Sequence, residues 1–474
     1  MARGALLGRA RSRKQRITIA STAPTLRVIV GVLALAAVSW PRAALGIQSR
    51  PTPPPEVRLS LSDAVSRALA RNLELRALRA DTGLAFAQLV GSRLRPNPAL
   101  ALEYQTTRER TAAGLEGEMS VSLTQDIPLW GVRGNRIRAA NLGLEAARYT
   151  TLDAARRVRR DVATAYRALQ YQEQRVILLD SLTRVNERIA RAAHLAFAQG
   201  LGSELDGRLS TAAWQQAALD RDVALRDYGI GQFEFARLLG DSLTTTYRLT
   251  DSLAPAGLRF LTASVSAGSE EGARYAPDGS AVDSLVRLAL AQRPDVRAAE
   301  SERDAEQASL AAARGAGKPA VAVGALYRRS RDNFTLGAQQ GTSLDRAFGV
   351  GVVIGLPFFN RNQGEVARAE FAGVAAGVRL ANARQRVERD VRVAVLRVAL
   401  TASQVETLRT AILPANADAL RIVAVAFGRG QANIFQVLQV QRAYVESTTS
   451  LLEAMRSYAE ALADLDAAVG NPLP

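Results

Sequence analysis

The chain of 474 residues carries 61 basic and 45 acidic residues, so its formal net charge is +16. It contains no cysteine and a single histidine, His194, which excludes disulfide scaffolds, cysteine nucleophiles and thiolate metal sites and leaves few ligands for zinc, copper or haem. Aromatic residues make up only 5% of the chain, a composition that favours long helices over a set of compact cores.

The first 46 residues have the pattern of a secretory signal peptide. Lys14 and seven arginines, with no acidic residue, accompany an apolar run over Val28–Val38, and Ala44–Gly46 places small residues at a cleavage position. Eleven apolar residues are too few for a membrane anchor, which needs about 20. We therefore expect export and removal of residues 1–46. The net charge then falls to +8, which removes half of the argument for a nucleic-acid partner.

The remaining sequence is internally duplicated. Val65–Ala70 resembles Val286–Ala291 at an offset of 221 residues, and Phe197–Gly200 resembles Phe427–Gly430 at an offset of 230. This length is far beyond the period of solenoid repeats, so two half-molecules are expected. The predicted division is an N-terminal linker at 47–58, a first repeat at 59–240, an inter-repeat linker rich in Ser, Thr, Gly and Pro at 241–280, and a second repeat at 281–474.

Each half is predicted to begin with a helix and to continue with two strands. Apolar spacing favours helices over Leu61–Leu94 and Val282–Arg314. Strict alternation of apolar and polar residues predicts four strands, over Ala99–Thr107, Glu118–Ile127, Val321–Tyr327 and Phe348–Leu356. Strands of about 9–11 residues are long enough to cross a bilayer when they are tilted.

Long helices follow the strands. No proline occurs between Pro128 and Pro255, so Gly131–Phe197 is predicted to be one helix of 67 residues, roughly 100 Å long at about 1.5 Å per residue. Two apolar seams on this helix predict neighbours on two sides, as in a wall of helices. Its basic run Arg156–Arg160 is interpreted as a solvated face and not as a nucleic-acid patch. The second half repeats the pattern, except that Pro414 is expected to kink its helix.

Four membrane-length strands cannot stand alone in lipid, because the open edges of their sheet would leave backbone groups unpaired at several kcal/mol each. Closure of the sheet therefore requires partner chains. Two, three or four copies would give eight, twelve or sixteen strands, and physical arguments alone leave these alternatives open. The helices would continue the barrel as a tube.

An ordered and duplicated set of short motifs points to a known family. The motifs are Asn97-Pro98, Asp126–Leu129, Arg133, Arg136-Ile137 and Ala139-Ala140 in the first half, and Leu356–Asn360, Leu413-Pro414, Phe427–Gly430 and Ile434–Leu438 in the second. With them the chain resembles the TolC family of outer-membrane efflux proteins over about Leu59 to Pro474. The resemblance implies a mainly α fold with a transmembrane β-barrel. In a homotrimer, twelve strands would form one barrel and the long coiled-coil helices a periplasmic tunnel.

The resemblance also implies a function, a passive exit duct in the outer membrane that extends into the periplasm. Such a duct contacts outer-membrane lipid, docks through a periplasmic adaptor (a membrane fusion protein) onto an inner-membrane pump, and exports small molecules or metal ions. The exit duct of a type I protein-secretion system shares this architecture and is the alternative. A cytoplasmic coiled-coil scaffold would share only the long helices.

Enzymatic activity, a cofactor and a metal site are not expected. Gly315–Lys318 lacks the spacing of a phosphate-binding loop, and the sequence contains no Gly-x-Ser-x-Gly elbow. His194 lies within the long helix and is expected to pack there or to face water. No nucleic-acid partner is expected, because the chain is predicted to be exported.

Residues at the helix reversals are candidates for contact with a partner protein. Phe197, Gly200 and Gly202 in the first half, and Phe427 and Gly430 in the second, lie near predicted turns, where glycine permits a positive φ. A turn by itself explains the glycines. The resemblance adds that these tips meet the adaptor.

Polar residues just past the turns are candidates for the tunnel entrance. Some family members carry two acidic residues at the positions of Gln436 and Gln439, so this chain departs from that pattern. The repeat-equivalent of Gln436 is Asp206, and three Asp206 carboxylates in a trimer would form an anionic ring. An equally simple interpretation of Asp206 is a solvated charge that interacts favourably with the N-terminus of its helix.

Five aromatic residues lie near the ends of the predicted strands: Tyr104, Trp130, Tyr327, Phe358 and Phe359. Aromatic belts mark the two membrane boundaries of outer-membrane barrels, so these residues are candidates for such belts. Ordinary packing explains each of them about as well.

Overall fold

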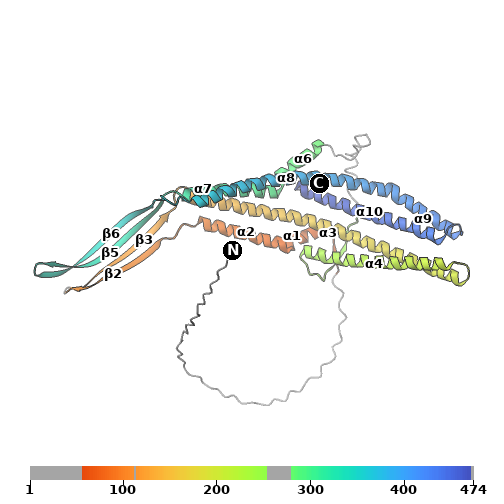
Figure 1. The fold of residues 1–474 in the computed structure, drawn as a ribbon, viewed down its shortest axis with the longest axis horizontal. Helices are drawn as coiled ribbons and strands as arrows, with labels where there is room; N and C mark the ends of the chain where they lie inside the picture. Colours follow the sequence, from red (N-terminus) through yellow and green to blue (C-terminus); the bar gives the residue numbers. More distant parts are fainter. Residues whose placement is uncertain (1–55, 112–113, 254–278, 471–474) are drawn as a thin grey trace, which may run out of the picture. The chain divides into compact units, whose positions relative to one another are not determined.

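The computed structural model describes residues 56–111, 114–253 and 279–470. The predicted signal peptide and parts of both predicted linkers lie outside the described residues. Within them the chain is mainly helical (Figure 1), with helices α1 (Leu61–Arg71), α2 (Leu73–Arg93), α3 (Val132–Ala198), α4 (Glu204–Leu239), α6 (Gly279–Gln292), α7 (Pro294–Ala316), α8 (Gln363–Thr407), α9 (Leu413–Gly428) and α10 (Ile434–Val469), and a π-helical turn η1 (Leu408–Ile412). The strands are β1 (Glu56–Leu59), β2 (Ala99–Thr111), β3 (Gly114–Ile127), β4 (Thr246–Leu249), β5 (Ala320–Leu336) and β6 (Gln339–Gly355).

A buried polar residue divides each opening helix into two. The prediction of one unbroken helix in each half, over Leu61–Leu94 and Val282–Arg314, is therefore wrong. Asn72 separates α1 from α2, and its side chain caps α2 by accepting a hydrogen bond from the N–H of Leu75 at 3.0 Å. Arg293 separates α6 from α7, and Pro294 then occupies the first turn of α7, where a missing N–H is tolerated.

The long helices agree with the prediction. Helix α3 runs for 67 residues without interruption, as the absence of proline requires. It returns through a short turn into α4, which packs along it. In the second half the π-helical turn η1 comes directly before Leu413 and Pro414, because proline has no N–H to continue the α-helical hydrogen bonds. The expected irregularity at Pro414 is thus present as a widened turn.

The four long strands form one antiparallel sheet in the order β2-β3-β5-β6. They are longer than predicted, and β5 and β6 each have 17 residues, because pairing continues through polar residues beyond the apolar alternation. A second, parallel pair joins β1 to β4 and was not predicted, since four-residue strands carry too short a pattern. In Figure 1 the β2-β3-β5-β6 sheet lies at the end opposite the α3–α4 and α9–α10 turns.

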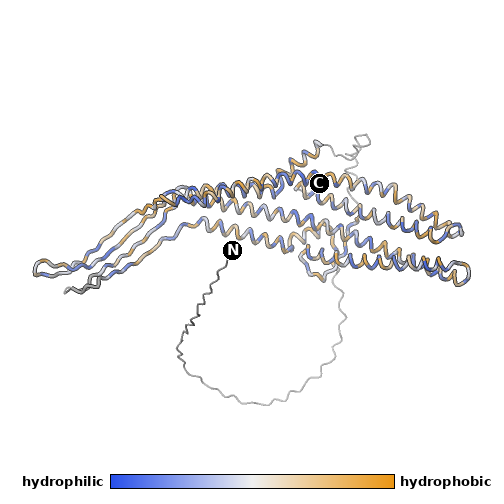
Figure 2. The backbone as a smooth tube through the Cα atoms, viewed as in Figure 1, coloured by the Kyte–Doolittle hydropathy of each residue, from blue (hydrophilic) through white to orange (hydrophobic). Residues whose placement is uncertain are grey.

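The buried core is divided between the two repeats. One cluster packs α1, α3, α4 and β4 around Tyr166, Phe235 and Tyr247, whose rings meet edge to face. The other packs α6, α7, α8 and α10 around Val391 and Tyr458. Helix α3 also packs against α7 and α10 and so joins the two halves. Figure 2 shows hydrophobic and hydrophilic residues interspersed along helices and strands, as expected where each element buries only part of its surface.

Candidate functional site

The four-stranded sheet has one continuous apolar face. Residues that lie opposite one another across the strands form rows, one of Leu100, Leu123, Ala325 and Val350, and the next of Leu102, Val121, Tyr327 and Phe348. In the single chain this face is open, and Phe348 and Val350 are 83% and 92% exposed. An apolar surface of this kind requires lipid or another chain to cover it.

The opposite face carries mainly small and polar side chains, with Leu326 and Val353 as apolar exceptions. Its rows are Thr124, Gly324 and Gly351, then Ser122, Leu326 and Gly349, then Ser120, Arg328 and Ala347. Arg328 makes an ion pair with Glu118 of β3 at 3.6 Å on this face. A face of this composition is suited to line a polar, water-filled lumen.

The two edges of the sheet are unpaired within the described part of the chain. Strand β2 pairs only with β3, and strand β6 pairs only with β5. Backbone N–H and C=O groups along both edges are therefore available to another strand. In a bilayer, where no water reaches them, such groups must be paired.

The aromatic candidates fall into two groups. At the junction with the helices, Trp130 takes a positive φ of 59°, and its indole N–H donates to the carbonyl oxygen of Pro319 at 2.8 Å. Lys318 lies over the Trp130 ring, 5.1 Å from its centroid. Phe358 and Phe359 follow β6 at the same junction, and Phe359 is 95% exposed.

The second group lies farther along the strands. Tyr104 is exposed on the apolar face of β2. Tyr327 packs against Phe348 of β6 with ring centroids 4.8 Å apart. Three of the five aromatic candidates therefore lie just past the strand ends, next to the helices, and the other two lie within the strands.

The tip residues form two similar turns. Gly200 and Gly430 adopt φ values of 72° and 71°, which L side chains rarely adopt. A Cβ atom at Gly202 would lie 3.1 Å from the Cβ of Ala196, so that glycine permits the turn to approach the end of α3 closely. Phe197 and Phe427 are exposed next to the turns.

The three entrance candidates differ in their surroundings. Asp206 is half-buried in the first turn of α4, where its negative charge interacts favourably with the positive end of the helix dipole. Gln436 is turned back into a capping box, in which its Oε1 accepts from the N–H of Asn433 at 3.0 Å. Gln439 is exposed. His194 contacts Thr211 at 2.9 Å and so links α3 to α4 near the turn.

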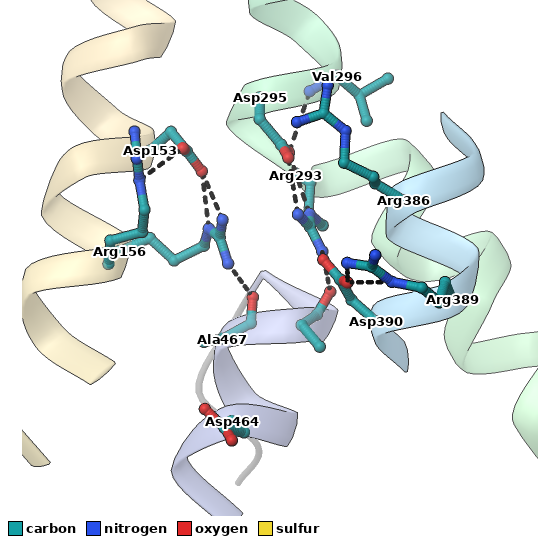
Figure 3. A network of polar contacts seen from close by, with 12 residues as sticks. Asp153, Arg156, Arg293, Asp295, Val296, Arg386, Arg389, Asp390, Asp464 and Ala467 are labelled. Carbon is teal, nitrogen blue, oxygen red and sulfur yellow. Dashed lines mark hydrogen bonds and ion pairs between the residues drawn. The ribbon is translucent and has the colours of Figure 1, made fainter. Parts of the chain in front are cut away.

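A buried ion-pair network, which the sequence analysis did not predict, links the two repeats (Figure 3). Arg293 is 4% exposed and donates to Asp295 at 2.7 Å, to Asp390 at 3.4 Å and to the carbonyl oxygen of Ala468 at 3.3 Å. On the other side of the C-terminus of α10, Arg156 donates to Asp153 and to the carbonyl oxygen of Ala467. The last carbonyl groups of α10 are thus held by arginines from both repeats.

The charges of the network stabilise one another. Burial acts to raise the pKa of Asp295, but the hydrogen bonds and positive charge of Arg293 outweigh it and hold that pKa below its usual value. Burial likewise acts to lower the pKa of Arg293, and the two carboxylates reverse this effect. Within the run Arg156–Arg160, Arg157 and Arg159 are exposed, as predicted for a solvated face. Arg156 departs from that prediction, because its side chain is only 15% exposed and donates to Asp153 and to α10.

The two repeats place a buried polar residue at equivalent positions. Asn72 and Arg293 are 221 residues apart, and each is a buried polar residue at a helix break. The Nδ2 of Asn72 donates to the carbonyl oxygen of Leu238 at 2.9 Å, just as Arg293 donates to that of Ala468, 230 residues later. The first half therefore uses a neutral amide where the second uses a charged network.

Among the residues that the structure describes, no group of three or more His, Asp or Glu side chains is placed to hold a metal ion. The structural features with a bearing on function are surfaces: the two faces and two edges of the sheet, and the tips of the helical hairpins.

Comparison with known proteins identifies the family. The family model described as "Outer membrane efflux protein" matches residues 64–241 and 285–471. The cobalt-zinc-cadmium resistance protein CzcC of Cupriavidus metallidurans is 25% identical over 415 residues, covering 87% of this chain and 90% of the relative.

Two solved outer-membrane channels share the fold. The Campylobacter jejuni CmeC channel has a TM-score of 0.68 at 18% identity, with 87% of this chain and 86% of that chain covered. The open state of the Neisseria gonorrhoeae MtrE channel has a TM-score of 0.66 at 22% identity, with 87% and 89% covered. The chain belongs to the outer membrane efflux protein family, and it is an outer-membrane channel that extends into the periplasm.

Proposed function

We propose that three copies of this chain close their sheets into one twelve-stranded barrel and form the passive exit duct of an efflux pump. The observation that carries this proposal is the sheet itself. It has an apolar face, a face of small and polar side chains, and two unpaired edges within the described part of the chain. Edge-to-edge closure of several copies satisfies all three features at once.

The need for an open lumen limits the number of copies. A barrel of about eight strands is just wide enough for its own side chains to fill, so two copies would leave no duct. Three or four copies leave a lumen, and the resemblance to the TolC family favours three.

Exposed apolar side chains on the helices also favour association of several copies. Helix α9 has no buried residue in the single chain, although Ile422, Val425 and Phe427 are large and apolar. Within the helical stretch Gln363–Gly428, one window of 18 residues is apolar enough to pass for a membrane span by length and composition alone. Burial against neighbouring helices of a tunnel wall would cover this surface.

The remaining roles rest on the resemblance to the TolC family. The tip residues Phe197, Gly200, Gly202, Phe427 and Gly430 would face a periplasmic adaptor, and Asp206, Gln436 and Gln439 would line the entrance. The junction aromatics would lie at the periplasmic membrane boundary. The inner-membrane pump would supply the energy, so the duct itself would catalyse nothing. The name of the CzcC relative makes divalent metal ions a candidate cargo, alongside other small molecules.

Disulfide cross-linking across the proposed junction tests the assembly, because the chain has no cysteine of its own. Leu102→Cys on the β2 edge would be combined in turn with cysteine at each residue from 344 to 354 on the β6 edge. At one register we expect bands of two and three linked chains on non-reducing gels, and no larger species. Each single-cysteine variant is the control. Absence of cross-links at every register, or a ladder beyond three chains, would contradict the proposal.

A further inference from the structure

A cluster of arginines continues the apolar face of the sheet toward the hairpin ends. Arg329 of β5 lies directly opposite Arg346 of β6. This pair is the next one on the same face after Tyr327 and Phe348, two residues farther along each strand. Arg331 follows on that face, opposite Leu344. All three arginines are exposed.

The cluster lies one hydrocarbon thickness from the helices. Arg329 is nine residues from Ala320, where β5 begins. At about 3.4 Å per residue and a strand tilt of about 40°, this is roughly 23 Å along the membrane normal. The apolar band of outer-membrane barrels is about 25 Å tall. Because the helices extend into the periplasm from the other end of the strands (Figure 1), the arginines lie at the level of the outer-leaflet headgroups.

The arginines have no anion to neutralise them within the described part of the chain. Arg328, on the opposite face, pairs with Glu118, but no described side chain makes an ion pair or hydrogen bond with Arg329, Arg331 or Arg346. Like charges that face each other directly across two strands destabilise the pair. An anion that bridges two guanidinium groups removes this repulsion.

We propose that Arg329 and Arg346, assisted by Arg331, bind phosphate groups on outer-leaflet lipid of the outer membrane. A guanidinium group matches a phosphate with two parallel hydrogen bonds, and two of them side by side fit a doubly charged group. The Tyr327–Phe348 pair lies directly beneath and contacts the acyl chains of the same lipid. The site lies within one chain, and its lipid exposure rests on the proposed barrel.

Binding of two purified lipids to the detergent-solubilised assembly tests this site. The probes are bis-phosphorylated lipid A and the same lipid after enzymatic removal of both phosphates, titrated by native mass spectrometry. Near an anionic headgroup each arginine contributes about fivefold to binding, so we expect Arg329→Gln/Arg346→Gln to bind the phosphorylated lipid roughly thirtyfold more weakly. Arg328→Gln, on the same strand but facing the lumen, is the matched control and should bind like the wild type.

Equal binding of both lipids by the wild-type assembly would overturn the proposal without any variant. Equal binding of the phosphorylated lipid by the double variant and Arg328→Gln would also overturn it. Should the double variant fail to assemble, Arg329→Lys/Arg346→Lys keeps both charges and is expected to keep the preference for the phosphorylated lipid; loss of that preference would contradict a charge-based site. A wild-type chain that forms no closed assembly would instead refute the proposed duct.

Discussion

Replacement of Arg293 by alanine tests whether its ion pairs and hydrogen bonds stabilise the second repeat. The change removes the donor to Asp295, Asp390 and the carbonyl oxygen of Ala468. Removal of one partner from a buried ion pair destabilises a protein by about 3–5 kcal/mol. Because the side chains of Asp295 and Asp390 are 27% and 32% exposed, water compensates them in part, and we expect the lower end, about 3 kcal/mol per chain.

The assay is urea unfolding of the detergent-solubilised protein, followed by circular dichroism. Asn72→Ala is the matched control, because it removes the repeat-equivalent donor without removing a charge. It leaves the carbonyl oxygen of Leu238 without that donor and should lower stability by about 1–3 kcal/mol. A loss below about 1 kcal/mol for Arg293→Ala would refute the assignment of a stabilising network.

The pH dependence of the free energy of unfolding distinguishes Arg293→Ala from Asn72→Ala. Since the pKa of Asp295 is lowered in the folded chain, its carboxylate stabilises the fold above its unfolded pKa of about 3.9, and this contribution is lost as the pH falls through the lowered value. The stability difference between wild type and Arg293→Ala should therefore narrow below about pH 4. The difference for Asn72→Ala should not change there, and equal behaviour of the two variants would contradict the electrostatic explanation.

Three further substitutions probe the turn, the lipid face and the entrance. Gly240→Ala should lower the free energy of unfolding by at least about 2 kcal/mol in the same assay, because φ is 71° and a Cβ would collide with the backbone at the end of α1. Gly200→Ala is the control, because its φ is nearly the same at 72° but the space around it is open, and it should cost about 1 kcal/mol. Equal losses for the two variants would contradict the collision. Leu102→Arg, on the lipid face, should destabilise the barrel by about 2–4 kcal/mol and lower the yield of assembled protein. Ala101→Arg, on the lumen face of the same strand, is the control and should assemble normally. Equal yields of the two variants would reject the assignment of faces. Asp206→Ala should alter cation conductance or block in single-channel records, and unchanged records would exclude the carboxylate ring.

Patterns that repeat along a single element were readable from the sequence. The absence of proline over Gly131–Phe197 predicted α3 nearly to the residue. Alternation of apolar and polar residues located all four long strands and their apolar face. These features are local, because the period of an element is set by its own backbone geometry.

Features that depend on contacts between distant segments were missed. The run Arg156–Arg160 looks like a solvated face, but its partners include the end of α10, about 310 residues later. The breaks at Asn72 and Arg293 were hidden because one polar residue hardly disturbs an apolar period. A signal for them did exist, since the two polar residues lie at the repeat offset of 221 and Pro294 follows the second.

The central claim is that copies of this chain close one barrel in the outer membrane. Separation of inner and outer membranes, followed by native mass measurement of the solubilised protein, tests it most directly. We predict a protein from the outer-membrane fraction with three times the mass of one processed chain. A monomer, or a protein recovered from the soluble or inner-membrane fraction, would contradict the account.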